Sequence, residues 1–347
     1  MLNILVMGAG AIGCFVGGTL AANGHNVTLV GRPALMDHIA GHGLSILWPG
    51  KAAQQTFPQT ATAVHLTGGP YDFILLTVKS PATAAAAQEL SALRLDGTSI
   101  VSLQNGIGNE ELLAEKFGPE RIVAGTITIP IEVPDVGTIR VSKDKGGLGL
   151  ASLRAGRPEE LLADALNASG LATLTYPDYR AMKWSKLLLN IVNNASSAIL
   201  NQRPTEIISQ PELFNLEIAA LREGVAVMQA QGISAVKLPG YPVQWLARLV
   251  SARWLPPPAQ RAILRPFMRS GRGTKMPSLH IDLASGRSSS EIEALNGAIV
   301  AAGRQVGVPT PVNRALTNIL SGLIAGQLDW ADYQHHPEKL LQAAAGR

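Results

Sequence analysis

The sequence predicts an α/β domain with a parallel sheet, followed by a mostly α-helical domain. Three observations support this. A glycine-rich turn directly follows an apolar run at the start of the chain, apolar strand-like runs then alternate with helical patterns, and the later half has apolar residues at three- and four-residue spacing. With 347 residues and 46% hydrophobic content, the chain is long enough for two cores. We expect the domains to span residues 1–177 and 178–347.

The first domain begins with a strand, a tight turn and a helix. A Gly-x-Gly-x-x-Gly pattern follows the apolar run 2–7, and it consists of Gly8, Ala9, Gly10, Ala11, Ile12 and Gly13. In such a turn the first glycine permits the bend, the second lets backbone approach a pyrophosphate, and the third lets the helix at 11–22 pack on the strand. Phosphate would contact N–H groups at the N-terminus of that helix. The pattern predicts a Rossmann-type domain with these six residues at a dinucleotide.

The end of the second strand indicates which dinucleotide. The strand at 26–30 is followed by Gly31 and Arg32, where NAD-binding proteins usually carry an acidic residue for the ribose 2′-hydroxyl. A guanidinium can pair with a 2′-phosphate through two N–H donors, whereas a carboxylate would repel it. Arg32 therefore favours NADP(H). The alternative is an arginine that only faces solvent.

Further strands are expected at 73–78, 99–103 and 122–124, with helices at 81–93 and 110–117. Short stretches at 137–141 and 148–151 suggest antiparallel strands that close one edge of the sheet. Lys79 and Asn105 follow the carboxyl ends of two strands, which is where ligands bind in open α/β sheets. The alternatives are a solvated lysine and an ordinary turn asparagine.

The second domain is expected to contain helices at 181–200, 211–231, 291–306 and 311–323. Its least regular part, residues 238–275, is rich in proline, which should break it into short helices that serve as a flap or an oligomer contact.

The positive charge of the chain lies in this same region. The net charge is +4, and no acidic residue occurs between Glu223 and Asp282. Without the eight basic residues found there, the chain has 21 basic against 25 acidic side chains. They are Lys237, Arg248, Arg253, Arg261, Arg265, Arg269, Arg272 and Lys275. No motif or aromatic interleaving points to nucleic acid. A solvated face, an anionic substrate and a membrane surface remain as explanations.

Composition excludes several other classes of protein. The only cysteine, Cys14, rules out an internal disulfide and is expected to be a packed apolar residue, which favours the reducing cytoplasm. No apolar run reaches the roughly 18 residues of a membrane span. The apolar stretch 2–22 is interpreted as part of the folded domain and not as a signal peptide, because its glycines match the nucleotide pattern. The seven histidines show no zinc-ligand spacing, so no metal is expected.

Polar residues interrupt an apolar helical run in the second domain. Lys186, Asn190 and Asn194 are spaced i, i+4 and i+8, which would place them on one face of a helix. Buried asparagines are costly without partners, so their repetition points to a binding face. A polar face in contact with water is the alternative.

Together with the motifs described above, this run makes the chain resemble the ketopantoate reductase (2-dehydropantoate 2-reductase) family over nearly its whole length. The resemblance rests on Gly8–Gly13, Val78-Lys79, Gln104-Asn105-Gly106, the Trp184-x-Lys186-Leu187-x-x-Asn190-x-x-x-Asn194 run, Pro277-Ser278-Leu279-His280-Ile281-Asp282, and the stretch from Glu291 to Gly297.

The resemblance implies a role for each matched residue. Lys186 would be the proton donor, and Asn105 would contact substrate or cofactor. Asn190 and Asn194 would hold the 2-oxo acid or its hydroxyl, and Ser278 would hold its carboxylate. Lys79, Arg32 and Glu291 would lie on the NADP(H) or substrate side.

Three departures from the family pattern bear on which acid fits, and one of them is that the basic, proline-rich stretch 238–275 makes the chain longer than a compact member. Members often place the glutamate eight residues after the aspartate, whereas Asp282 and Glu291 are nine apart, and many have a histidine where this chain has Ile129-Pro130.

The function that the resemblance implies is NADPH-dependent reduction of ketopantoate. The alternatives are a reductase of another small 2-oxo acid and a non-catalytic NADP-binding sensor. The expected partner is the small anionic substrate, and a homodimer is left open.

Overall fold

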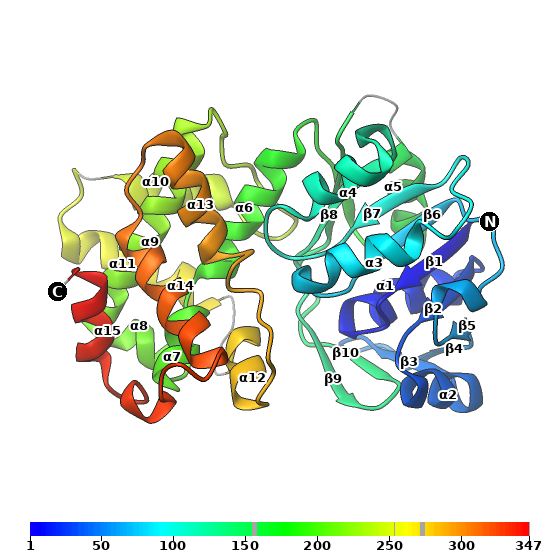
Figure 1. Cartoon of the computed structure of the whole chain (residues 1–347), viewed down its shortest axis with the longest axis horizontal. Coiled ribbons are helices and arrows are strands. Elements are labelled where there is room, and N and C mark those ends of the chain that lie inside the picture. Colours follow the sequence, from blue (N-terminus) through cyan, green and yellow to red (C-terminus); the bar gives the residue numbers. More distant parts are fainter. Residues whose placement is uncertain (155–157, 253, 271–274, 347) are drawn as a thin grey trace. The chain divides into compact units, whose positions relative to one another are not determined.

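A computed structural model of the chain describes residues 1–154, 158–252, 254–270 and 275–346. The chain divides into two compact units (Figure 1). The N-terminal unit comprises Met1–Gln104, Gly108–Lys183 and Leu238–Tyr241, and the C-terminal unit comprises Asn105–Ile107, Trp184–Lys237 and Pro242–Arg347. The expected domain limit after residue 177 stays a prediction.

An eight-stranded sheet forms the centre of the N-terminal unit, in the order β12-β11-β8-β7-β6-β1-β2-β5. Its strands are β1 (Asn3–Met7), β2 (Asn26–Val30), β5 (Gln59–Ala61), β6 (Phe73–Leu76), β7 (Ser99–Ser102), β8 (Ile122–Ile127), β11 (Leu148–Ser152) and β12 (Thr173–Thr175). All neighbouring strands are parallel except β8 and β11, which are antiparallel. The predicted parallel α/β sheet is confirmed.

Helices cover both faces of this sheet, because successive strand residues point to opposite sides. Ile4 and Val6 of β1 pack in the core that contains α1 (Ala11–Ala22) and α5 (Pro158–Ala168). Leu5 and Met7 pack in the opposite core, which contains α3 (Thr83–Leu90) and α4 (Asn109–Phe117) (Figure 1). The remaining elements of this half are α2 (Pro33–His42) and the short 3₁₀ turns η1 (Val64–Leu66), η2 (Ser80–Ala82) and η3 (Pro119–Arg121).

One strand prediction was wrong. The stretch 148–151 forms β11 and adds an antiparallel strand as expected, but the stretch 137–141 joins a separate sheet. That four-stranded sheet has the order β4-β3-β10-β9 and contains β3 (Leu44–Leu47), β4 (Gln54–Thr56), β9 (Ile131–Asp135) and β10 (Thr138–Val141). β10 pairs in parallel with β3, which lies about ninety residues earlier, so local sequence could not reveal the pairing.

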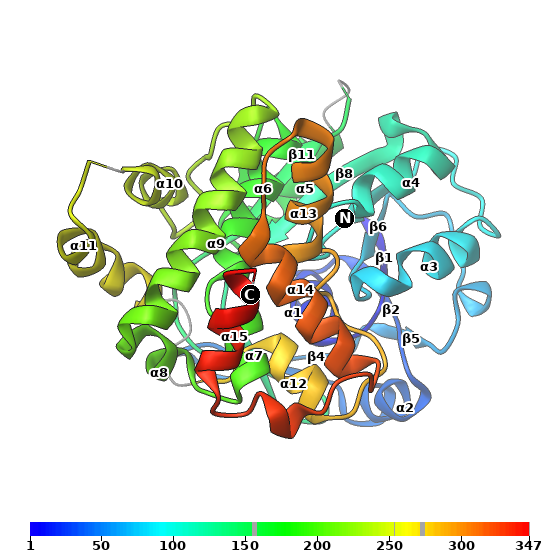
Figure 2. The same cartoon turned by 60° about the vertical axis from the view of Figure 1, so that its left-hand side comes forward.

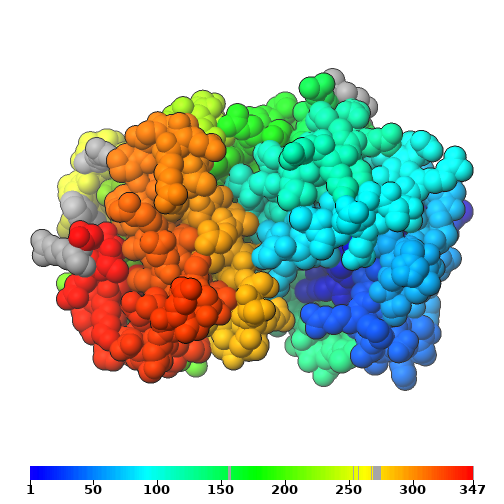
Figure 3. Space-filling model, in the orientation of Figure 1, coloured from blue at the N-terminus to red at the C-terminus, as the bar shows by residue number. Residues whose placement is uncertain are grey.

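The described residues of the C-terminal unit form helices joined by turns and loops, with no strand among them, which confirms the predicted fold class. Its helices are α7 (Ala195–Leu200), α8 (Pro204–Ser209), α9 (Pro211–Ala230), α10 (Val243–Ser251), α11 (Pro257–Ser270), α12 (Ser278–Ala284), α13 (Asn296–Val306), α14 (Pro311–Ile324), the 3₁₀ turn η4 (Trp330–Asp332) and α15 (Pro337–Ala344). Helix α6 (Tyr179–Ile191) starts in the N-terminal unit and ends in this one. Helix α9 lies against α10, α13, α14 and α15 (Figure 2), and α14 and α15 are neighbours on the surface, in orange to red in Figure 3.

The proline-rich segment 238–275 does form separate helices, α10 and α11, although Pro266 lies inside α11. Its first four residues belong to the N-terminal unit, where Thr128 Oγ1 donates a 2.8 Å hydrogen bond to the carbonyl of Pro239. Arg253 and Arg272 of the basic group lie outside the described residues, and nothing is described of the Arg269 side chain. No helix among the described residues combines the length and apolar character that a membrane crossing requires.

Candidate active site

The glycine turn is tightly packed at Gly8 and Gly13 and open beside Gly10. Gly8 has φ +106°, a conformation that favours glycine, and Thr77 Oγ1 donates a 2.6 Å hydrogen bond to its carbonyl. A Cβ on Gly13 would lie 2.4 Å from that same carbonyl oxygen, whereas a Cβ on Gly10 would have no heavy atom nearer than 4.0 Å. Gly13 is therefore required by packing. The space beside Gly10 lies at the N-terminus of α1, where backbone N–H groups lack helical partners.

The two basic residues expected near the nucleotide flank this turn. Arg32 is exposed and occupies the N-cap position of α2, and a Cβ on the preceding Gly31 would come within 2.7 Å of the Ala9 side chain. Lys79 is half-buried and follows Val78, whose backbone N would lie 2.7 Å from a Cβ on Gly8. Arg32 and Lys79 therefore each directly follow a residue that packs against the glycine turn.

The residues expected at the substrate all lie in the C-terminal unit. Lys186 and Asn190 are one turn apart near the end of α6; Lys186 is half-buried and Asn190 is buried. The Asn190 amide Nδ2 donates a 3.1 Å hydrogen bond to Asn105 Oδ1. The structure therefore joins two of the predicted residues that are 85 positions apart.

The prediction that Asn194 shares a helical face with Lys186 and Asn190 was wrong. Helix α6 ends at Ile191, Asn193 adopts a left-handed conformation with φ +51°, and Asn194 caps a new helix, α7. Asparagine tolerates this conformation better than most residues, which explains how the chain turns here. The buried Asn194 Oδ1 instead accepts a hydrogen bond of 3.3 Å from the backbone N of Leu279.

This bond links Asn194 to the neighbour of Ser278, the exposed first residue of α12. The same short helix is anchored by His280, whose Nε2 lies 2.7 Å from Asn201 Oδ1 and whose ring meets Trp330 edge-on. Because Asn201 Oδ1 only accepts hydrogen bonds, His280 donates from Nε2. Burial lowers the pKa of His280 below its usual 6.5, which favours the neutral ring.

Glu291 is buried, but the helix predicted from this residue begins only at Asn296. Residues 291–295 form turns, and the loop at Asn105–Ile107 packs on them. The Ile107 backbone N donates a 3.0 Å hydrogen bond to the Ala294 carbonyl, and a Cβ on Gly106, which has φ +87°, would meet Ala294 at 2.6 Å. Asn105 is thus held next to the segment that carries Glu291.

Lys183, three residues before Lys186, is the residue that sequence reasoning missed. It looks like an ordinary helix lysine, yet only 3% of its side chain is exposed, and its Nζ forms a 2.8 Å ion pair with Glu110, which is 1% exposed. Nζ also donates a 2.6 Å hydrogen bond to the Gln104 carbonyl. The spacing of Lys183, Leu187 and Asn190, i, i+4 and i+7, was an available signal that Lys183 faces inward with them.

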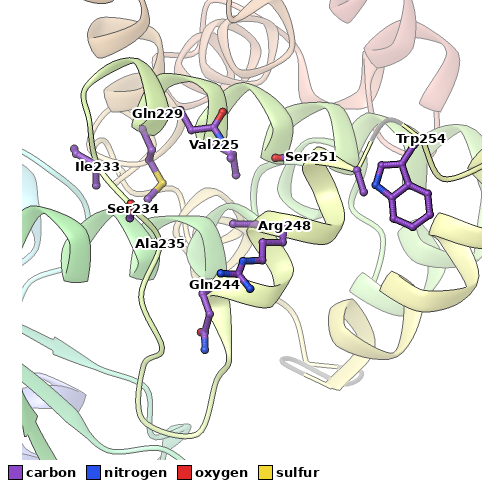
Figure 4. A pocket seen from close by; sticks show the side chains of 12 residues that line it. Val225, Gln229, Ile233, Ser234, Ala235, Gln244, Arg248, Ser251 and Trp254 are labelled. Atoms are coloured by element: carbon purple, nitrogen blue, oxygen red, sulfur yellow. The ribbon is translucent and has the colours of Figure 1, made fainter.

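Cys14, possible metal ligands and one cavity were considered separately from the predicted site residues. Cys14 is buried, and burial raises the pKa of its thiol to about 12, in line with a packing role. Among the described residues, no group of three or more His, Cys, Asp or Glu side chains is placed to hold a metal ion. A cavity of about 470 Å³ opens between α9 and α10, with Gln244, Arg248 and Trp254 among its lining residues (Figure 4). None of the predicted site residues lines it.

Two family models match the chain. The model described as "Ketopantoate reductase PanE/ApbA" matches residues 4–154, and "Ketopantoate reductase PanE/ApbA C terminal" matches residues 178–324. The chain belongs to the ketopantoate reductase family. Membership confirms the resemblance seen in the sequence motifs and makes the protein an oxidoreductase.

Named relatives agree with this assignment. A 2-dehydropantoate 2-reductase of Halobacterium salinarum is 28% identical over 322 residues, which cover 92% of this chain and 98% of the relative. The crystal structure of a ketopantoate reductase of this family from Ralstonia eutropha has a TM-score of 0.78 at 27% identity and covers 94% of this chain and 99% of that one. The structure of 2-dehydropantoate 2-reductase from Geobacter metallireducens has a TM-score of 0.78 at 28% identity and covers 92% and 99%.

Proposed function

We propose that this protein reduces 2-dehydropantoate (ketopantoate) to pantoate, with NADPH as the hydride donor. The observation that carries the proposal is the arrangement in the C-terminal unit, where Lys186 lies one turn before Asn190 and Asn190 is hydrogen-bonded to Asn105. An ammonium group next to paired amides is suited to a carbonyl oxygen that gains negative charge. Family membership supports the same reaction.

The glycine turn is proposed to hold the nucleotide. Backbone from Gly8 to Gly13, which includes Ala9, Ala11 and Ile12, would surround the pyrophosphate, because a methyl-sized space is left open beside Gly10. The exposed guanidinium of Arg32 would pair with the 2′-phosphate, which is the reason for preferring NADPH over NADH. Lys79 and Glu291 are proposed as further cofactor contacts, with Asn105 at the border between cofactor and substrate.

When bound, NADPH would supply a hydride to C2 of the 2-oxo acid. Lys186 Nζ is proposed to donate a hydrogen bond to the C2 oxygen, to stabilise the charge that develops there, and then to transfer its proton so that the product carries a hydroxyl. Asn190 would orient the same oxygen, and its own amide is oriented by Asn105. Asn194 would hold the substrate's hydroxyl end, and Ser278 Oγ would donate to the carboxylate.

The test is NADPH oxidation by the purified protein with a panel of 2-oxo acids: ketopantoate, 2-oxoisovalerate, 2-oxobutyrate and phenylglyoxylate. The proposal expects the highest kcat/KM with ketopantoate and NADPH, and a lower value with NADH. A higher kcat/KM with another acid would assign the protein to that acid instead. Absence of turnover with every acid, together with NADPH binding, would indicate a non-catalytic sensor.

A further inference from the structure

Lys183 sits in an enclosed set of acceptors inside the N-terminal unit. Its Nζ forms the ion pair with Glu110 Oε1 at 2.8 Å and donates to the carbonyls of Gln104 at 2.6 Å and Gly125 at 3.4 Å. With 3% of its side chain exposed, the ammonium has three acceptors and little access to solvent. It is therefore poorly placed to give a proton to substrate, unlike the half-buried Lys186.

Of these acceptors, the Gln104 carbonyl lies nearest in sequence to a predicted site residue. The Gln104 side chain is fixed as well, since its Nε2 donates to the Val78 carbonyl at 2.9 Å and to Thr83 Oγ1 at 2.8 Å. The next residue along the chain is Asn105, whose Oδ1 accepts the hydrogen bond from Asn190. Two residues of helix α6 therefore contact this part of the chain. Lys183 binds the peptide carbonyl before Asn105, and Asn190 binds the Asn105 side chain.

A buried ion pair is weak evidence for stability alone, because apolar residues of similar volume often replace such a pair at little cost. An apolar side chain at position 183 could not donate to the Gln104 carbonyl. We propose that Lys183, paired with Glu110, is a positioning residue: it fixes the Gln104 backbone so that Asn105 meets Asn190 and the reacting carbonyl. This inference rests on the proposed role of Asn105.

The experiment uses the charge-neutral double variant Lys183→Met/Glu110→Leu, which leaves no unpaired buried charge, and Lys116→Met as the control. Lys116 is an exposed lysine of α4, the helix that also carries Glu110. We expect the double variant to fold and to bind NADPH with the wild-type Kd, while kcat with the preferred 2-oxo acid falls on the order of tenfold to a hundredfold, the scale of a small misplacement. The control should match the wild type in every measurement.

A double-mutant cycle with Asn105→Ala separates positioning from a structural role. If Lys183 acts through Asn105, the Lys183→Met/Glu110→Leu change should lower kcat strongly in the wild type and only slightly in the Asn105→Ala background. The proposal is overturned if kcat falls equally in both backgrounds or if the double variant keeps the wild-type kcat. A double variant that does not fold would also overturn it, because the pair would then be structural. Failure of the proposed function would instead appear in the wild type, which would reduce no 2-oxo acid.

Discussion

Two glycine substitutions only three residues apart should have opposite consequences for stability and cofactor binding. A Cβ at Gly13 would lie 2.4 Å from the Gly8 carbonyl oxygen and 2.7 Å from Thr77 Oγ1, both closer than van der Waals contact allows. Gly13→Ala is therefore expected to lower the free energy of unfolding by about 1–3 kcal/mol, the usual cost of overpacking. The gain in helix propensity of up to about 1 kcal/mol offsets part of this loss.

Gly10→Ala should leave the fold nearly unchanged. Its nearest neighbour would be 4.0 Å from the new Cβ, and its φ of −90° and ψ of −164° are open to alanine. We expect the free energy of unfolding to change by about 0.5 kcal/mol or less. The methyl group would occupy the space proposed for the pyrophosphate, so the Kd for NADPH should rise by about tenfold to a hundredfold, equivalent to an overpacking cost of about 1–3 kcal/mol.

The assay is urea unfolding followed by circular dichroism, together with a fluorescence titration of NADPH, on the wild type and both variants. Wild-type NADPH affinity in Gly10→Ala would refute the placement of the pyrophosphate at this turn. Unchanged stability in Gly13→Ala would refute the packing argument.

Three further outcomes are expected. Arg32→Asp should weaken NADPH binding far more than NADH binding, because it replaces an attraction to the 2′-phosphate by a repulsion, and equal losses would remove the argument for NADP. Because burial raises the pKa of Cys14 to about 12, iodoacetamide should label this thiol only after unfolding, and labelling of the native protein that increases between pH 8 and pH 9 would contradict its buried state. Neutralising Arg261 and Arg265 by glutamine should leave the NADPH Kd unchanged, since the proposed phosphate contacts lie elsewhere, and a weaker affinity would bring the basic segment into the nucleotide site.

The N-terminal half was the more predictable part of the fold, because its signals are local. The strand, the Gly8 turn and the helix at 11–22 follow from adjacent residues, and the structure places α1 at Ala11–Ala22. The strand at 138–141 was misplaced because it pairs with β3, far earlier in the chain, as well as with its hairpin neighbour β9. Hydrophobic alternation predicts that a strand forms, but it does not identify the partner.

The motifs indicated which residues to consider for the candidate site, but the sequence predicted their geometry only in part. Apolar spacing continues through Val192, so nothing in the periodicity marks the left-handed turn at Asn193 that separates Asn194 from α6. The contact between Asn194 and Leu279 joins residues 85 positions apart and requires the folded chain. The ion pair of Lys183 likewise requires the folded chain, since its partner Glu110 lies 73 positions earlier.

The proposed mechanism requires Lys186 to donate the proton to the oxygen of the reduced carbonyl. The most direct test is single-turnover oxidation of bound NADPH by ketopantoate in Lys186→Ala, measured with the NADPH Kd and thermal unfolding of the same variant. Lys339→Ala is the control, because Lys339 is an exposed lysine on α15 of the same unit. We expect wild-type NADPH affinity and stability in Lys186→Ala and a chemical step slowed on the order of 10²-fold or more, with no change in the control. A wild-type rate of NADPH oxidation in Lys186→Ala would show that another group supplies the proton and would contradict the mechanism.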